Sequence, residues 1–415
     1  MDAKMQQQSS PSPPATAIPE VLDDDNLLEQ ILIRLIFPTG LVRAALVCRR
    51  WLHVASEPAF LRRYINLHPP RLLGFYAQHG LLAVPKFVQM PDTPPELAAA
   101  VRRASSALYD TRVSGRFVMV KSISSCLDGR LLVRLYGYDH IHAVLSPLHP
   151  GRDAIVLPRP PQSTNAMDGG ATCILHRCLP DGCVVTCAAR WCWWDQSQWT
   201  MRIDELQDDC AWQNLASPPV IYRPAPIVDF VHILPMNDGK IFLVSSASTA
   251  AAMCSASSAL GPIALPDVLD LDCCWSTTTR NYMIVPVVDD RSIARFCLMY
   301  VKDLQIHIWV YHLNGGEWVL DDTICLRKIC ANSGVAISDF QDGLTTTGAM
   351  VHAIGQGAKF VFVQVGHDVL YVHIESRVVK KVYSLVPGDG NLTKLTPFMM
   401  IDSPVFPVNQ KEVST

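Results

Sequence analysis

The segment Leu22–Trp51 constrains this chain most, because it carries two short apolar helical patterns that cannot bury themselves. Its sequence is LDDDNLLEQILIRLIFPTGLVRAALVCRRW. The three aspartates at 23–25 place hydrogen-bond acceptors and negative charge where a helix begins. We therefore expect the first helix to start there. It should end at Phe37-Pro38, because proline disfavours helical geometry in the residue before it.

Apolar residues recur at helical spacing through this segment. In the first helix they are Leu27, Leu28, Ile31, Leu32 and Leu35, and in the second Leu41, Val42, Ala45, Cys48, Leu52 and Ala55, with Trp51 as a large anchor. Ser56-Glu57-Pro58 predicts the cap and first turn of a third helix that runs through Tyr64. Such stripes must pack against the rest of the chain or against a partner.

The order of these residues resembles an F-box. Leu27-Leu28, Ile31-Leu32, Arg34-Leu35 and Val47-Cys48-Arg49-Arg50-Trp51 follow the pattern of that family, whereas Asp24 and Gln30 stand where the family usually has proline and glutamate. The run from His68 to Tyr76 is similar to the large grass family of F-box proteins. The resemblance implies that the helices contact a Skp-family adaptor through Leu27, Leu28, Ile31, Leu32, Leu35, Leu41, Val42, Val47, Cys48 and Trp51.

The composition is that of a two-domain globular protein. The chain has 415 residues, of which 49% are hydrophobic and 18% charged, so it exceeds the size at which a single core usually stops growing. A formal charge of -3 and the lack of a long basic run argue against nucleic acid as a partner. The sequence predicts no membrane span and no secretion signal. We expect an intracellular protein, in the cytoplasm, the nucleus or both.

From about Phe117 onward, short β-rich runs alternate with turn signals, which predicts an all-β domain. Turn markers recur about fifty residues apart, the length of one propeller blade: Asp128-Gly129, Asp181-Gly182, Asp238-Gly239, Asp289-Asp290, Asp342-Gly343 and Asp389-Gly390. We expect a propeller of about six blades, with a β-sandwich as the alternative. The F-box resemblance also implies an associated β-propeller. The predicted fold class is thus α+β and multidomain, with three short helices before the β domain.

The expected organisation has five parts. They are a disordered leader at 1–17, the F-box at 18–67, a connector at 68–109, the propeller-like domain at 110–403 and a tail at 404–415. In the connector, Leu72–Tyr76 predicts a strand and Pro94-Pro95-Glu96 opens a helix through Ala107. The small-residue run Ser245–Leu260 predicts a loop or a poorly formed strand between blades.

Several residue clusters could suggest a metal or ligand site. Without a secretion signal, the fourteen cysteines should be reduced. Cys173, Cys178, Cys183, Cys187 and Cys192 lack a Cys-x-x-Cys pair, and His140 and His142 lack a third ligand nearby, so we expect no metal and no cofactor. Trp191, Trp193, Trp194 and Trp199 could form a stacking platform, although packing between blades is the simpler interpretation.

No catalytic motif is present. The sequence lacks a nucleophile elbow, a phosphate-binding loop, a His-Glu-x-x-His zinc motif and a dinucleotide fingerprint. Paired carboxylates such as Asp208-Asp209, Asp289-Asp290 and Asp321-Asp322 fall at predicted turns. We therefore expect no catalytic residues.

The resemblance implies a function without bond chemistry. It implies a substrate receptor of an SCF-type (Skp, cullin, F-box) ubiquitin ligase, which binds the adaptor, through it a cullin, and a target protein that the sequence does not identify. Two alternatives stay open: an F-box protein that acts outside a ligase, and a glycan-binding propeller.

Overall fold

The computed structural model describes residues 24–80, 83–113, 115–136, 141–149, 153–159, 168–178, 183–192, 198–207, 210–216, 221–222, 231–235, 240–245, 251–255, 259–263, 266, 281–288, 294–312, 316–336, 349–388, 390–400 and 406. The chain divides into two compact units. One comprises Met1–Arg71 with Met400–Thr415, and the other is Leu72–Met399. The leader at 1–17 and nearly all of the tail at 404–415 lie outside the described residues.

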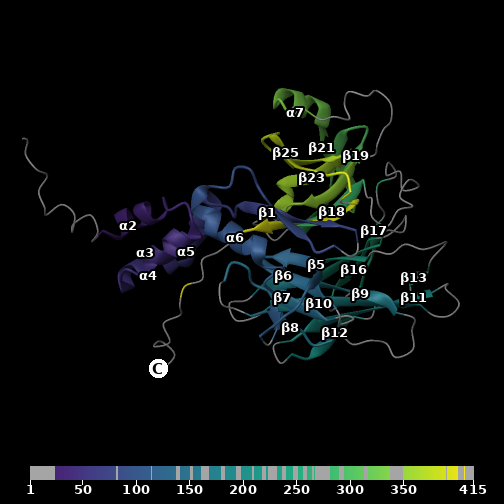
Figure 1. The fold of residues 1–415 in the computed structure, drawn as a ribbon, viewed down its shortest axis with the longest axis horizontal. Coiled ribbons are helices and arrows are strands. Elements are labelled where there is room, and N and C mark those ends of the chain that lie inside the picture. Colours follow the sequence, from purple (N-terminus) through teal and green to yellow (C-terminus); the bar gives the residue numbers. More distant parts are fainter. Residues whose placement is uncertain are drawn as a thin grey trace, which may run out of the picture. The chain divides into compact units, whose positions relative to one another are not determined.

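The first unit is helical (Figure 1). Its elements are α2 (Asp25–Leu32), α3 (Pro38–Ala45), α4 (Arg49–Ser56) and α5 (Pro58–Leu67). The predicted cap of α2 is confirmed, because Asp24 Oδ1 accepts hydrogen bonds from the backbone amides of Asn26 at 2.8 Å and Leu27 at 3.4 Å. Pro38 opens α3 in the first helical turn, where its missing amide costs nothing.

We expected three helices, but the described residues of this unit form four. The predicted second helix divides into α3 and α4 because Cys48 is extended, with φ −158° and ψ 168°, and serves as the N-cap of α4. The core of the unit contains two buried residues from each of these helices: Leu28, Leu32, Leu41, Ala45, Val54, Ala55, Phe60 and Tyr64.

The second unit is built from antiparallel sheets. Five sheets of four or five strands each form from strands that are consecutive in the chain. The first two are β5 (Val120–Leu127), β6 (Arg130–Leu135), β7 (His142–Leu145) and β8 (Ile155–Val156), and then β9 (Asp168–Cys178), β10 (Cys183–Cys192), β11 (Gln198–Leu206), β12 (Trp212–Ala216) and β13 (Ile221–Tyr222). The other three are β14 (Val231–Pro235), β15 (Lys240–Ser245), β16 (Ala251–Ser255) and β17 (Ala259–Ile263), then β18 (Tyr282–Val288), β19 (Ala294–Lys302), β20 (Gln305–His312) and β21 (Trp318–Cys325), and last β22 (Met350–Ile354), β23 (Phe360–Val365), β24 (Asp368–His373) and β25 (Val379–Ser384). This arrangement agrees with the expected propeller-like fold.

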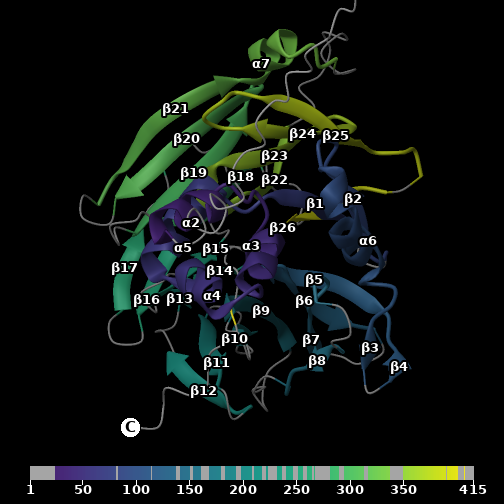
Figure 2. The same cartoon turned by 90° about the vertical axis from the view of Figure 1, so that its left-hand side faces the viewer.

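A sixth sheet joins the two ends of this unit. It has the order β2-β1-β26, from β1 (Leu72–His79), β2 (Lys86–Gln89) and β26 (Leu392–Met399). One strand from each sheet contacts the corresponding strand of the next sheet, in the order β5, β9, β14, β18, β22 and β26, and β26 contacts β5 again. The sheets therefore form a ring whose closing sheet pairs β1 with β26, as Figure 2 shows by the order of its colours.

Hydrogen bonds and aromatic packing connect the closing sheet to its neighbouring sheets. Lys394 Nζ on β26 donates to the carbonyl oxygens of Ile123 and Ser124 on β5, both at 2.8 Å. Burial lowers the pKa of Lys394 to about 8. Phe75 on β1 packs against Phe362 on β23, with 5.1 Å between ring centroids. Hydrophobic side chains thus pack between the closing sheet and the neighbouring sheet β22–β25.

The remaining elements lie around these sheets. They are the 3₁₀ turn η1 (Pro95–Leu97), α6 (Ala98–Ser106), the hairpin β3 (Arg112–Val113) and β4 (Arg116–Phe117), α7 (Leu326–Asn332) and the 3₁₀ turn η4 (Gln356–Ala358). None of the helices in the described part of the chain is long and apolar enough to cross a membrane.

Two expectations about segments differ from the structure. Residues 72–109, which we placed in a connector, contribute β1, β2 and α6 to the β unit. The run Ser245–Leu260 was expected to separate blades, but Ala251–Ser255 is β16, which pairs with β15 inside one sheet. Small side chains do not prevent this pairing, because strand hydrogen bonds use only the backbone.

Candidate protein-binding surface of the helical unit

Helix α2 has an interior face and an exposed apolar face. Leu28 and Leu32 are completely buried in the core of the helical unit, whereas Leu27 and Ile31 are 37% and 40% exposed. The two exposed residues are four positions apart and therefore share one face of the helix. An exposed apolar pair on a short helix predicts contact with another protein.

The link between α3 and α4 adds a second exposed apolar segment. Leu46 and Val47 are 68% and 66% exposed, and Cys48 is exposed as well. The break between the two helices causes this exposure, because Cys48 is extended and its neighbours are not held against the core.

An ion pair brings these two segments together. Arg50 Nη2, at the start of α4, lies 2.7 Å from Asp25 Oδ1, at the start of α2. Both side chains are solvent-accessible, so the pair contributes at most about 1 kcal/mol to stability. Its effect is geometric, since it places the first turn of α2 next to the residues that follow the α3–α4 link. We name Leu27, Ile31, Leu46, Val47 and Cys48 the α2–α4 surface.

The opposite end of α2 is fixed by α5 and the residue that follows it. Arg63 Nη1 lies 2.8 Å from Glu29 Oε1, and His68 Nε2 donates to the carbonyl oxygen of Ile33 at 2.6 Å. The His68 ring also packs on Tyr64, with centroids 4.8 Å apart. These contacts hold α2 against the core, so its exposed face is presented on a rigid support.

The ten predicted adaptor residues have three kinds of surroundings. Leu28, Leu32 and Leu41 are buried in the unit's own core; Leu35, Val42 and Trp51 are partly buried; Leu27, Ile31, Val47 and Cys48 are exposed. Without rearrangement, only exposed and partly exposed side chains can contact a partner. The buried leucines shape the surface by holding the helices in place.

Sequence reasoning missed two exposed apolar residues. Ile36, 50% exposed, follows α2, and Leu46, 68% exposed, precedes Val47. The exposure of Leu46 follows from the break in the helix at the extended Cys48. The sequence did not predict this break, because its apolar pattern is continuous through these residues.

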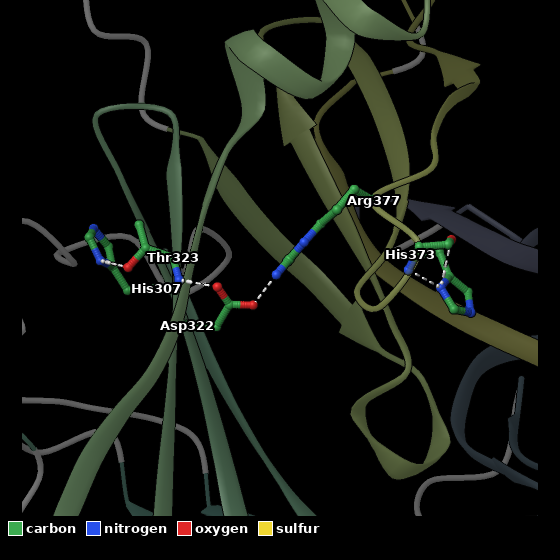
Figure 3. A network of polar contacts seen from close by, with 6 residues as sticks. His307, Asp322, Thr323, His373 and Arg377 are labelled. Carbon is green, nitrogen blue, oxygen red and sulfur yellow. Dashed lines mark hydrogen bonds and ion pairs between the residues drawn. The ribbon is translucent and has the colours of Figure 1, made fainter.

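The paired carboxylates Asp321 and Asp322 were expected at a turn, but both lie within strand β21, so that prediction was wrong. In Figure 3, Arg377, in the turn between β24 and β25, forms an ion pair with Asp322 on β21. The hydrogen bond from Arg377 lowers the pKa of the Asp322 carboxyl, which also accepts a hydrogen bond from the Thr323 amide at 2.7 Å. Asp322 therefore stays ionised and links two neighbouring sheets. Asp208-Asp209 and Asp289-Asp290 lie outside the described residues.

The cysteine, histidine and tryptophan clusters lie only partly within the described residues. Strand pairing sets Cys173 opposite Cys187 and Cys178 opposite Cys183. His142 is buried on β7, whereas His140, Trp193 and Trp194 lie outside the described residues. Among the residues described, no group of three or more His, Cys, Asp or Glu side chains is arranged to hold a metal ion.

Comparison with known families gives two matches. Residues 25–68 match the model "F-box-like", and residues 122–406 match the model "F-box protein AT5G49610-like, beta-propeller". No curated protein sequence matches the chain.

Solved structures are similar only at a distance. A protein from Lactobacillus plantarum is 11% identical with a TM-score of 0.35, over 76% of this chain and 81% of that one. Oligogalacturonate lyase in complex with manganese is 8% identical with a TM-score of 0.35, over 66% of each chain. The α-L-arabinofuranosidase Arb93A from Fusarium graminearum is 11% identical with a TM-score of 0.33, over 62% of this chain and 79% of that one. Such low similarity transfers no activity to this chain.

Proposed function

Because the chain belongs to the F-box proteins with an AT5G49610-like β-propeller, we propose that it is the substrate-recognition subunit of an SCF-type ubiquitin ligase. The helical unit would bind a Skp-family adaptor, and through it a cullin, while the β unit would bind a target protein. Its place of action would be inside the cell, in the cytoplasm, the nucleus or both.

The observation that carries this proposal is the α2–α4 surface. Four of its residues, Leu27, Ile31, Val47 and Cys48, combine the predicted adaptor role with an exposed side chain. The buried leucines beneath them form a separate core, so the unit can fold before it binds. Burying these apolar side chains in an adaptor would supply the main driving force for association.

The receptor would contribute proximity rather than catalysis. F-box proteins of this family are generally non-catalytic adaptors. A target held by one unit and an adaptor held by the other raise the effective concentration of target lysines near the charged ubiquitin-conjugating enzyme.

Co-purification with a plant Skp adaptor and a cullin tests the proposal. The full chain should bring down both proteins, and a variant with Ile31→Asp and Val47→Asp should bring down neither. Leu67→Asp is the matched control, because Leu67 on α5 is 62% exposed but lies outside the α2–α4 surface; it should behave like the wild type.

Three other results would change the conclusion. Wild-type chain that binds the adaptor without the cullin would favour an F-box protein that acts outside a ligase. Failure of the wild-type chain to bind the adaptor would refute the proposal, as would normal binding by the folded double variant.

A further inference from the structure

The exposed apolar side chains of the β unit gather in one region. Nine large hydrophobic residues in its described part are exposed, and five of them lie in two short segments, 109–119 and 155–156. These are Tyr109, Phe117, Met119, Ile155 and Val156, which are 60%, 66%, 62%, 56% and 40% exposed. Together with Arg112 and Arg116 we name them the hairpin surface. Scattered exposed apolar residues are ordinary, but a cluster of this kind marks an interaction site.

Backbone contacts hold the two segments side by side. The amide of Ala154, next to β8, donates to the carbonyl oxygen of Arg112 on β3 at 3.2 Å. Arg112 pairs with Phe117 across the β3–β4 hairpin, and its guanidinium lies 4.4 Å from the centre of the Phe117 ring. The amide of Val118 extends the hairpin by donating to Thr111 at 3.0 Å. Figure 2 shows the hairpin next to the sheet that ends in β8.

The hairpin surface includes an open sheet edge. In the described sheet, β8 pairs with β7 on one side and is the last strand in the order β5-β6-β7-β8. Edge strands usually carry charge or are covered, because unpaired backbone groups beside apolar side chains attract another strand. Ile155 and Val156 occupy this edge; among the described residues the hairpin bonds to the outer side at Ala154, and no strand pairs with the outer side of Ile155 or Val156. An extended peptide could therefore add to β8 and contact Phe117 at the same time.

The positive charge of this region indicates that its partner carries negative charge. Residues 98–159 contain nine arginines and lysines but only four aspartates and no glutamate, whereas the whole chain has 35 basic and 38 acidic residues. Arg112 and Arg116 are both exposed, and neither forms an ion pair in the described structure. The cation–π contact with Phe117 orients Arg112 without neutralising it. Two free guanidinium groups favour carboxylates in a ligand.

We propose that the hairpin surface binds an extended acidic segment of a partner protein, with apolar side chains at alternate positions. The carboxylates would pair with Arg112 and Arg116, and the apolar side chains would pack on Phe117, Met119 and the β8 edge. Nucleic acid fits less well, because Met119, Ile155 and Val156 offer aliphatic contacts whereas bases stack on aromatic rings. That this segment belongs to a ubiquitination target rests on the proposed function; the binding itself does not.

Fluorescence anisotropy with designed peptides tests the proposal on the full chain. The probe is a labelled peptide of about ten residues that alternates Glu and Leu. Comparison peptides replace Glu with Lys, or Leu with Ser, and an oligothymidylate represents nucleic acid. The Glu/Leu peptide should bind at least about tenfold more tightly than each comparison ligand, and added salt should weaken its binding.

Substitutions at exposed positions test whether the peptide binds to the hairpin surface or elsewhere on the β unit. Arg112→Glu with Arg116→Glu should weaken Glu/Leu binding at least about tenfold, and Phe117→Ser with Ile155→Ser should do the same. The matched control is Lys328→Glu with Leu320→Ser, on α7 and β21, where both residues are also exposed. The control should bind like the wild type.

Each other outcome overturns the proposal. These outcomes are no binding of the Glu/Leu peptide to the wild type, tighter binding of the oligothymidylate, or equal loss in the control. The same preparations are checked for adaptor co-purification. If the wild-type chain binds the Glu/Leu peptide but not the adaptor, only the proposed function is refuted. If it binds the adaptor but not the peptide, only this inference is refuted.

Discussion

Leu32 and Ile31 are neighbours on α2, but alanine at these two positions should have different effects. Leu32→Ala should destabilise the helical unit, whereas Ile31→Ala should weaken adaptor binding and leave the fold intact. Leu32 is fully buried and Ile31 is 40% exposed. Leu→Ala in a packed core costs about 2–5 kcal/mol. The four helices of this unit lie between Asp25 and Leu67, and a folded segment of about 45 residues has a total stability of roughly 2–7 kcal/mol. Leu32→Ala should therefore remove most of the stability of the helical unit.

Ile31→Ala should leave the fold almost unchanged. Its side chain is already partly in water, and alanine is the better helix former by a few tenths of a kcal/mol, which offsets the small loss of packing. The net change in the free energy of unfolding should stay within about 1 kcal/mol. The contacts that this residue can lose are those with a partner.

Hydrogen exchange of the full chain, read by mass spectrometry on peptides from 24–68, measures both effects. At about 1.4 kcal/mol per factor of ten, Leu32→Ala should speed exchange of protected amides in α2, α4 and α5 from about 30-fold up to the rate of the unfolded unit. Ile31→Ala should change exchange less than about fivefold and still weaken adaptor binding. Peptides from 360–373, in the β unit, serve as the internal reference.

Equal exchange in the two variants would refute the division of α2 into a core face and a contact face. So would faster exchange in Ile31→Ala than in Leu32→Ala. Adaptor binding that is lost in both variants with exchange unchanged would show that Leu32 contacts the partner directly, which its burial excludes in this structure.

Three further predictions concern the β unit. Burial lowers the pKa of Lys394 from 10.5 to about 8; between these values the unfolded chain binds more protons than the folded one, so the free energy of unfolding contributed by this lysine should rise with pH. Urea unfolding at about pH 7.5 and about pH 9.5 should show a rise that Lys394→Met lacks; an equal rise in the variant would contradict it. Asp322→Asn removes the ion pair with Arg377, and because both side chains are about one-third exposed, the loss should be at most about 1 kcal/mol and should shrink in about 1 M salt. A loss that salt leaves unchanged would argue against an ionic cause. Gly74→Ala would place a Cβ 2.3 Å from a carbonyl oxygen of β2 and should cost about 1–3 kcal/mol in thermal unfolding, whereas Gly40→Ala, with its nearest atom at 3.9 Å, should be neutral or stabilising.

The helical unit shows how far an apolar pattern can be interpreted. The 3.6-residue period correctly indicated that this segment is helical and that Asp24 and its neighbours begin the first helix, although α2 ends at Leu32 rather than at Phe37-Pro38. It could not separate Leu28, in the core, from Leu27, on the surface, because both fit one wide stripe. That distinction depends on which helices pack together, and in particular on the extended Cys48 that divides α3 from α4.

The turn marker Asp128-Gly129 correctly predicted a tight hairpin between β5 and β6. Asp128-Gly129 has positive φ at both residues, 47° and 68°, as a two-residue hairpin requires. The markers at 181, 238 and 289 fall in the corresponding position, between the first and second strands of the next three sheets, although those residues lie outside the described ones. The fifth and sixth markers do not, because the turn between β22 and β23 is the 3₁₀ turn η4. The local signal was therefore sufficient to predict the repeat length but not every blade.

The closing sheet could not be predicted from any local pattern, and this has a consequence for how the two units depend on each other. Thr393 Oγ1 donates to the carbonyl oxygen of Gln78 across 315 residues of sequence, whereas His68 reaches Ile33 across 35. The ring is complete only after its last strand is made, so its folding is dominated by distant pairings. The buried core of the helical unit comes from residues between Leu28 and Tyr64, with Phe406, which follows β26, packed against it. Substitutions in the α2–α4 surface and in the hairpin surface should therefore add independently, so that adaptor binding and peptide binding can be measured separately in one full-length protein.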